Sequence, residues 1–120
     1  MSYVDGFVIP LAKKKVPAYK RMSAKAGKVW MEYGALSYVE CIGDDLDSEH
    51  GLPFPKLAKL KKGETVAFSW IVYKSRAHRD RVLKKVMADP RIAEDMKDMK
   101  SMPFDLKRMS YGSFKPIVDL

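Results

Sequence analysis

The sequence predicts an α+β fold in which a four-stranded antiparallel sheet has helices on one face and a second copy of the chain on the other. The spacing of apolar residues changes along the chain in the order strand, helix, strand, strand, helix, strand. The segment 65–73 has apolar side chains on both of its faces, with Phe68 and Trp70 on one and Ala67 and Ile71 on the other. Because helices cover only one face of so small a sheet, the second apolar face requires another cover.

The first half of the chain predicts a strand, a helix and a second strand. Residues 3–9 alternate as a strand does, although Asp5 interrupts one of its apolar faces. From Pro17 to Tyr33 the apolar residues recur at steps of three and four, which is typical of an amphipathic helix, and a proline suits the first helical turn. Residues 35–42 then predict the second strand.

The second half begins with a polar stretch, residues 43–63, in which we expect only one helical turn, at 57–60. After the strand at 65–73, Ser75 predicts the N-cap of a helix, and Asp89 followed by proline predicts the start of a shorter one. Residues 107–117 predict the last strand. The shorter helix is expected to turn three apolar side chains inward, Ile92, Met96 and Met99.

This element order is the split βαβ arrangement of the ferredoxin-like fold. We expect residues 1–120 to form a single domain, because the chain shows neither an internal repeat nor a linker. Right-handed crossovers would place both helices on one face and the first and third strands side by side in the middle. Those are the two strands with apolar residues on both faces, so the pattern favours a dimeric α/β barrel, a homodimer in which two bare sheet faces meet.

The composition suggests where the protein resides and what it attracts. The formal charge is +8, from 23 lysines and arginines against 15 acids, so the surface would attract anions such as nucleic acid, although solvated helix faces explain the charge equally well. No apolar stretch approaches the ~20 residues of a membrane span, and no signal peptide is evident. Cys41 is the only cysteine, which suits a reducing compartment. We expect a cytoplasmic protein without a membrane partner.

The chain resembles the YbaA-like family of small bacterial proteins over nearly its whole length. The resemblance is carried by Tyr3-Val4-Asp5-Gly6-Phe7, Glu40-Cys41, Gly63-Glu64-Thr65-Val66, Asp89-Pro90-Arg91 and Met102-Pro103-Phe104-Asp105. It implies a dimeric ferredoxin-like barrel. It implies no catalytic residues, because the family has no assigned function.

Asp5 is the first candidate for a functional side chain. A carboxylate on an apolar strand face must meet donors, reach water or be protonated. Because the last strand should lie beside the first, Arg108 could be its partner; a structural ion pair, a place at the barrel mouth and an acid or base role all remain open. Glu40 raises the same question on the second strand. A catalytic pair formed by the carboxylates of Asp5 and Glu40 is not expected, because the third strand lies between the first and the second.

Aromatic residues supply a second candidate site. Phe7, Tyr38, Trp70 and Tyr111 could line a pocket for a flat ligand, or they could simply form the core and the dimer interface. The two histidines lack a partner at ligand spacing, so we expect no metal and no cofactor.

The leading hypothesis is a homodimer that binds a small organic molecule in or near the barrel, with cofactor-independent enzyme activity left open. The candidate ligand-binding residues are Asp5, Glu40, Trp70, Arg108 and Tyr111. The alternative is a non-catalytic interaction protein whose basic helices bind nucleic acid or an acidic protein. Nucleic acid is the less expected partner, because the third strand has no lysine or arginine among its aromatic residues. A fully packed dimer that acts only through its surface also remains open.

Overall fold

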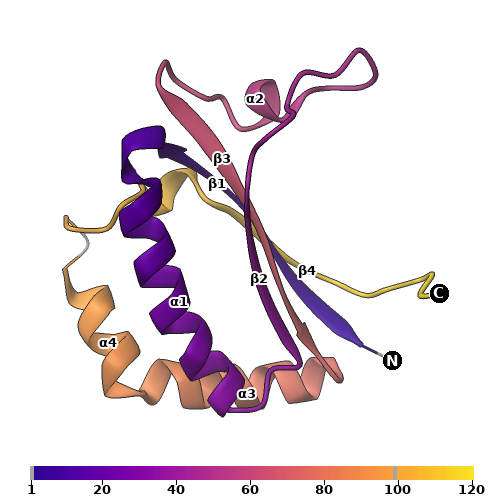
Figure 1. Ribbon diagram of the computed structural model, residues 1–120. Helices are drawn as coiled ribbons and strands as arrows, with labels where there is room; N and C mark the ends of the chain where they lie inside the picture. Colours follow the sequence, from indigo (N-terminus) through magenta and orange to yellow (C-terminus); the bar gives the residue numbers. More distant parts are fainter. Residues whose placement is uncertain (1, 99) are drawn as a thin grey trace.

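The computed structural model describes residues 2–98 and 100–120. Its strands are β1 (Tyr3–Ala12), β2 (Ser37–Ile42), β3 (Glu64–Tyr73) and β4 (Ser110–Phe114). Its helices are α1 (Val16–Glu32), α2 (Phe54–Leu57), α3 (Arg76–Ala88) and α4 (Pro90–Lys97), with 3-10 turns η1 (Lys13–Lys15) and η2 (Leu106–Arg108). The four strands form one antiparallel sheet in the order β2-β3-β1-β4 (Figure 1).

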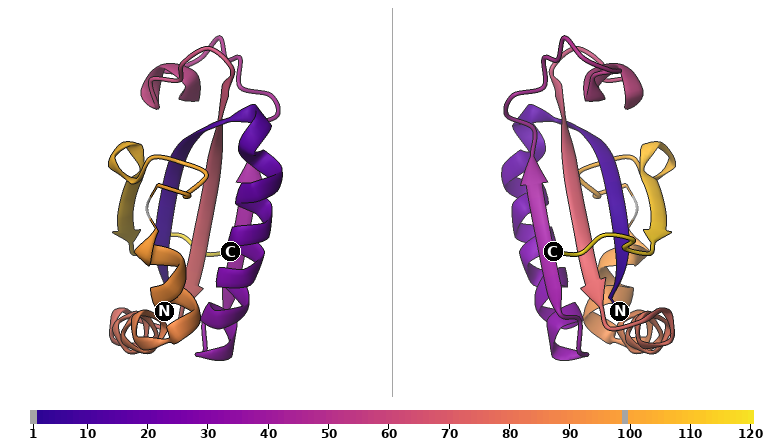
Figure 2. Two further views of the ribbon diagram at one scale, coloured as in Figure 1. Left: turned by 90° about the vertical axis from the view of Figure 1, so that its left-hand side faces the viewer. Right: turned by 90° about the vertical axis from the view of Figure 1, so that its right-hand side faces the viewer.

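The sheet has one covered and one open face. Helices α1, α3 and α4 lie together on one side of it, whereas on the other side the described residues place α2 with its flanking loops and the C-terminal tail (Figures 1 and 2). This arrangement confirms the ferredoxin-like element order and the placement of the helices on one face. None of the helices in the described residues has the length and apolar run needed to span a bilayer.

Both predicted helix caps are confirmed. The Ser75 hydroxyl accepts a 3.1 Å hydrogen bond from the His78 N–H, and an Asp89 carboxylate oxygen accepts one of 2.8 Å from the Arg91 N–H. Helix α1 ends before Gly34, whose φ of +110° favours glycine. The helical turn expected at 57–60 lies instead at α2, where a proline occupies the first turn.

The last strand is shorter than residues 107–117. Its predicted start is the 3-10 turn η2, because the Asp105 carboxylate accepts a 2.9 Å hydrogen bond from the Lys107 N–H and caps that turn. Its end comes early because Phe114 already lies opposite Val4, next to the first residue of β1. Pro116 also has no N–H with which to continue the ladder.

The core lies between the sheet and the helices. Side chains of β1 and β3 that point to this side pack against α1, α3 and α4, among them Ile9, Ile71 and Tyr73. Helix α1 approaches β2 closely at Gly27, where a Cβ atom would lie only 2.7 Å from the ring of Tyr38. The core therefore requires a glycine at this point of the helix.

The inward side chains predicted for the last helix are confirmed only in part. Ile92 is buried, whereas Met96 is 50% exposed, so the prediction for Met96 is wrong. Met96 lies one turn after Ile92 on the same side of α4, next to the last residue of this short helix, and unlike Ile92 it is not part of the buried core cluster. Met99 lies outside the described residues.

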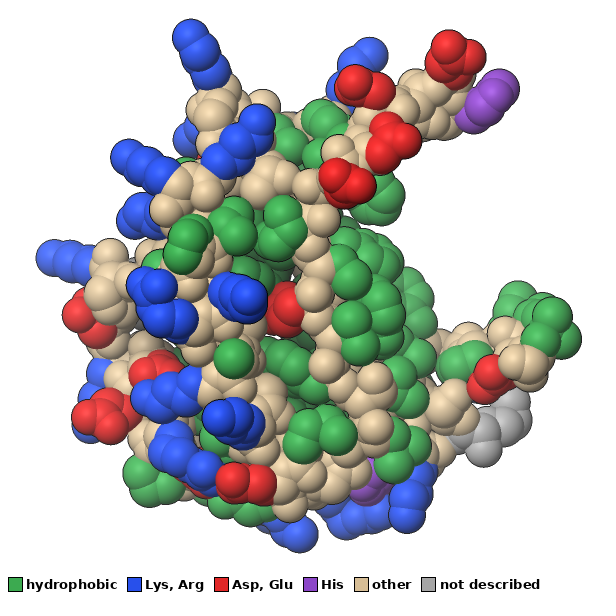
Figure 3. Space-filling model, in the orientation of Figure 1, with side chains coloured by type: hydrophobic (Ala, Val, Ile, Leu, Met, Phe, Trp, Pro, Cys, Tyr) green, Lys and Arg blue, Asp and Glu red, His purple; other side chains and the backbone are tan. Residues whose placement is uncertain are grey.

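The open face is apolar, as the pattern of 65–73 predicts. Phe68 is 45% and Phe114 is 60% exposed, and the ring of Phe54 on α2 meets Phe68 edge-on at 6.0 Å. Hydrophobic side chains gather over this side of the sheet, whereas lysines and arginines dominate the helix side (Figure 3). In the C-terminal tail, Ile117 is 93% exposed. The second apolar face of the sheet therefore remains bare in one copy of the chain.

Candidate ligand-binding cleft

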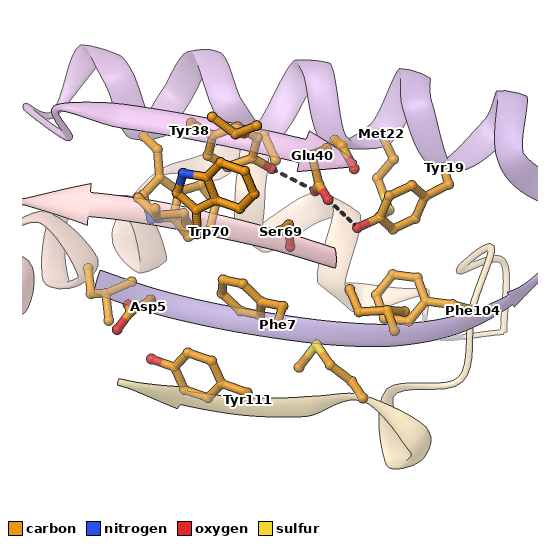
Figure 4. A pocket seen from close by; sticks show the side chains of 18 of the residues that line it. Asp5, Phe7, Tyr19, Met22, Tyr38, Glu40, Ser69, Trp70, Phe104 and Tyr111 are labelled. Atoms are coloured by element: carbon orange, nitrogen blue, oxygen red, sulfur yellow. Dashed lines mark hydrogen bonds between the residues drawn. The ribbon is translucent and has the colours of Figure 1, made fainter. Parts of the chain in front are cut away.

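A cleft of about 370 Å³ opens between the covered face of the sheet and the helices. Its walls come from all four strands, from α1 and α3, and from the segment before β4 (Figure 4). Most of its lining is aromatic or aliphatic, including Phe7, Ile9, Met22, Trp30, Leu83 and Phe104. The dimeric barrel predicted from the sequence would hold a ligand between two copies of the sheet, whereas this cleft belongs to a single copy.

One end of the cleft is built around Glu40. The Tyr19 hydroxyl, on the buried side of α1, donates a 2.7 Å hydrogen bond to Glu40 Oε1. The Tyr38 hydroxyl, two residues before Glu40 on the same strand face, donates to Oε2 at 3.5 Å. Two further hydroxyl residues, Ser23 and Ser69, line the same end. The side chains of Tyr19, Tyr38 and Glu40 converge there (Figure 4).

Both tyrosines at this end remain hydrogen-bond donors. Burial, together with the hydrogen bond to Glu40 and its negative charge, raises the pKa of Tyr19 well above its usual value. Burial and the nearby charge of Glu40 raise the pKa of Tyr38 in the same way. Each phenol therefore keeps its proton at physiological pH and supplies no negative charge to the cleft.

The other end of the cleft contains Asp5, which is 1% exposed. Its Oδ1 accepts hydrogen bonds from Arg79 Nη1 at 2.8 Å and from the Ser113 hydroxyl at 2.7 Å. The Arg79 guanidinium also lies 5.2 Å from the ring centre of Tyr3. The buried carboxylate thus has both a counter-charge and hydrogen-bond donors.

Tyr111 stands at the edge of the cleft between these two ends. Its ring is stacked on that of Phe7, with centres 4.9 Å apart and an angle of 22° between the planes. Phe7 is half-buried, and Tyr111 is exposed. The pair forms a flat aromatic wall that faces the interior on one side and solvent on the other.

The structure brings four of the five predicted site residues to the same cleft, namely Asp5, Glu40, Trp70 and Tyr111. Asp5 and Glu40 are not adjacent, because β3 separates their strands and Asp5 is bound by Arg79. Trp70 borders the cleft as well as a hollow on the open face, where its ring lies 5.7 Å from that of Phe68. It therefore belongs to both surfaces.

The predicted ion pair between Asp5 and Arg108 is wrong. Arg108 binds both carboxylate oxygens of Glu64, at 2.7 and 2.8 Å, and does not line the cleft. Arg108 lies in η2, before β4 begins, and Glu64 pairs with the far end of β1 at Ala12. Asp5 is opposite Ser113 instead, which lies in β4 several residues after Arg108 in the chain.

The sequence reasoning missed Arg79 as the partner of Asp5, and Tyr19 as a donor to Glu40. A signal for Arg79 was present, because it lies three residues before Val82 and seven before Val86, on the buried stripe of α3. A charged residue on such a stripe needs a buried partner. Tyr19 gave no comparable signal, since its spacing is simply that of a core position. Among the described residues, no three His, Cys, Asp or Glu side chains are grouped closely enough to hold a metal ion.

Residues 2–106 match the model of a family described as a protein of unknown function, DUF1428. The chain belongs to this family. It is also 44% identical over 119 residues to the uncharacterized protein YbaA of Escherichia coli and of Shigella flexneri, with 99% of each chain covered. The resemblance to the YbaA-like family is thereby confirmed.

Solved structures share the fold at low sequence identity. SnoaB, described as a cofactor-independent oxygenase from Streptomyces nogalater, matches with a TM-score of 0.61 and 10% identity over 99% of this chain and 96% of its own. A NIPSNAP family protein of unknown function from Agrobacterium tumefaciens has a TM-score of 0.58 and 16% identity, over 96% and 87%. An uncharacterized NIPSNAP domain protein from Burkholderia xenovorans has 0.55 and 15%, over 95% and 93%. At these identities the similarity concerns the fold.

Proposed function

We propose that the protein binds a small, largely aromatic organic molecule in the cleft between its sheet and helices. The observation that carries this proposal is the convergence of Glu40, Tyr19 and Tyr38 on one end of a mainly apolar cleft. The volume of the cleft, about 370 Å³, is within the range of small-molecule sites, which combine apolar walls with a few polar groups that orient the ligand.

Cofactor-independent catalysis is an extension of this proposal. It is supported by analogy of fold with SnoaB, whose description is that of a cofactor-independent oxygenase. It is also compatible with a carboxylate in the cleft that could accept a proton from a bound molecule. The binding proposal does not depend on this extension.

We further propose that two copies of the chain pair through their open sheet faces. The support is a hollow of about 870 Å³ on that face, which is bordered by Val4, Phe68, Val72 and Phe114 and by the C-terminal tail. A second copy related by a two-fold axis would present the same apolar surface, and both faces would then leave water together. In such a dimer each copy keeps its own cleft on the helix side.

Fluorescence of Trp30 tests the binding proposal, because Trp30 lines the cleft. In the Trp70→Phe variant Trp30 is the only tryptophan, and titration with naphthalene or naphthol should change its emission in a saturable way. Ala26→Phe should abolish this change, since Ala26 lines the cleft on α1. Ala24→Phe on the exposed side of α1 is the matched control. The proposal fails if no probe binds, or if Ala26→Phe binds as well as the control.

A further inference from the structure

We infer that the molecule bound in the cleft carries a hydrogen-bond donor, and that this donor binds the carboxylate of Glu40. The inference rests on the proposed binding function and deepens it by naming the chemical class of the ligand. The class is an aromatic skeleton bearing either a phenol-type hydroxyl or a protonated amine.

The Glu40 carboxylate has acceptor capacity that the protein does not use. An ionised carboxylate has about four acceptor positions. The structure shows two protein donors, Tyr19 at 2.7 Å and Tyr38 at 3.5 Å, and the second distance is at the outer limit of a hydrogen bond. Glu40 lines the cleft and is only half-buried. An additional donor approaching from the cleft therefore finds a free acceptor.

The charges around the cleft favour a neutral or cationic ligand. In the described part of the chain, no lysine, arginine or histidine forms an ion pair with Glu40. The guanidinium at the other end of the cleft, that of Arg79, is already bound to Asp5, Asp80 and Ser113. An anionic ligand would thus meet a like charge without a free cation, whereas a neutral donor or a cation would be favoured.

The walls of the cleft are flat and aromatic. Phe7 and Tyr111 form a stacked pair, and Trp30 lies 6.0 Å from Tyr38 on the opposite side. Flat apolar surfaces such as these suit an aromatic skeleton, and their ring faces also attract a cation. The donor and the skeleton of the ligand would therefore be bound by neighbouring parts of one cleft.

Four probes of one skeleton test this inference: naphthalene, naphthol, naphthylmethylammonium and naphthoate. Their dissociation constants are measured near neutral pH with the unaltered protein by isothermal titration calorimetry, because Trp70 itself borders the cleft. A hydrogen bond to a charged group predicts that naphthol or the ammonium binds at least ~10-fold more tightly than naphthalene, and that naphthoate binds most weakly. A preference for naphthol identifies a hydroxyl ligand, and a preference for the ammonium identifies an amine.

Two variants test whether the tighter binding of the donor probes depends on the carboxylate of Glu40. Glu40→Gln should reduce the advantage of the donor probes over naphthalene to less than about threefold, because the amide forms the weaker hydrogen bond of a neutral group. Tyr19→Phe should preserve that advantage, because it removes a competing donor and leaves Glu40 charged. Glu49→Gln in the exposed loop removes the same charge elsewhere and serves as the control.

The outcomes separate this inference from the proposed function. If all four probes bind equally, or if naphthoate binds most tightly, the inference is overturned while the binding cleft stands. It is also overturned if Glu40→Gln keeps the full preference for donors. If none of the probes binds, the proposed function itself fails.

Discussion

Arg79 on α3 donates a hydrogen bond of 2.8 Å to the buried carboxylate of Asp5 on β1. The side chain of Arg79 is 11% exposed and that of Asp5 is 1% exposed, so the pair lies almost wholly inside the protein. Because each charge needs the other in this environment, the pair fixes α3 against the middle of the sheet. It also explains why a carboxylate is tolerated on an apolar strand face.

Asp5→Asn should lower the free energy of unfolding by about 3 kcal/mol, because it removes the buried counter-charge of the Arg79 guanidinium and leaves only the exposed Asp80. Urea denaturation followed by circular dichroism measures the loss. Asp80→Asn is the matched control: Asp80 is also bound to Arg79 but is 60% exposed, so we expect a loss below roughly 1 kcal/mol. Equal losses in the two variants would contradict a structural role for Asp5.

Gly27→Ala should destabilise the protein by about 1 to 3 kcal/mol, although alanine is normally the better helix former. The reason is the approach of α1 to β2, which leaves only 2.7 Å between the new Cβ atom and the ring of Tyr38. Thermal unfolding measures the effect. In a Tyr38→Ala background the same substitution should become neutral or stabilising; if it stays destabilising there, the contact is not the cause.

Acid should destabilise the protein through Glu64. The hydrogen bonds from Arg108 lower the pKa of this carboxyl from 4.5 to about 2 in the folded state. Its contribution is therefore complete above the unfolded pKa and is lost as the pH falls from about 4.5 towards 2. Free energies of unfolding measured across this window should fall less steeply in Glu64→Gln than in the original protein.

Asp89 also contributes to the loss of stability in acid, since hydrogen bonds from Arg91 and from Tyr33 lower its pKa as well. The control for the pH series is Glu49→Gln in the exposed loop, which should follow the unaltered protein at every pH. A Glu64→Gln profile that also coincides with the unaltered one would show that the ion pair with Arg108 does not contribute to stability.

Phe68→Asp should disrupt the proposed dimer. Phe68 lies on the open face beside Trp70, and a charge there would be buried against the second copy. We expect the dimer dissociation constant to rise by roughly a hundredfold or more, which sedimentation equilibrium measures. Met31→Asp on α1 changes an equally exposed side chain on the helix side and should leave the association unchanged. A monomeric wild-type protein would overturn the dimer proposal.

Local sequence determined the element order and the two-faced character of the sheet. Alternation along 65–73 and the three- and four-residue steps of α1 are visible in any short window, and so are Ser75 and Asp89 as caps. The ferredoxin-like topology then follows, because few connections of these elements are sterically allowed. Asp5 and Glu40 could be singled out in the same way, since each is a charge within a strand.

Only the tertiary structure decided which side chains meet. The partner of Asp5 is 74 residues away in Arg79, and Tyr19 reaches Glu40 across 21 residues. Such contacts depend on the register of β4 against β1 and on the distance between α1 and β2, which is limited by Gly27. The register and the distance each result from many weak contacts spread over the whole chain, so a short sequence pattern does not reveal them. For the same reason, the position of the cleft inside one copy follows from the packing of the helices.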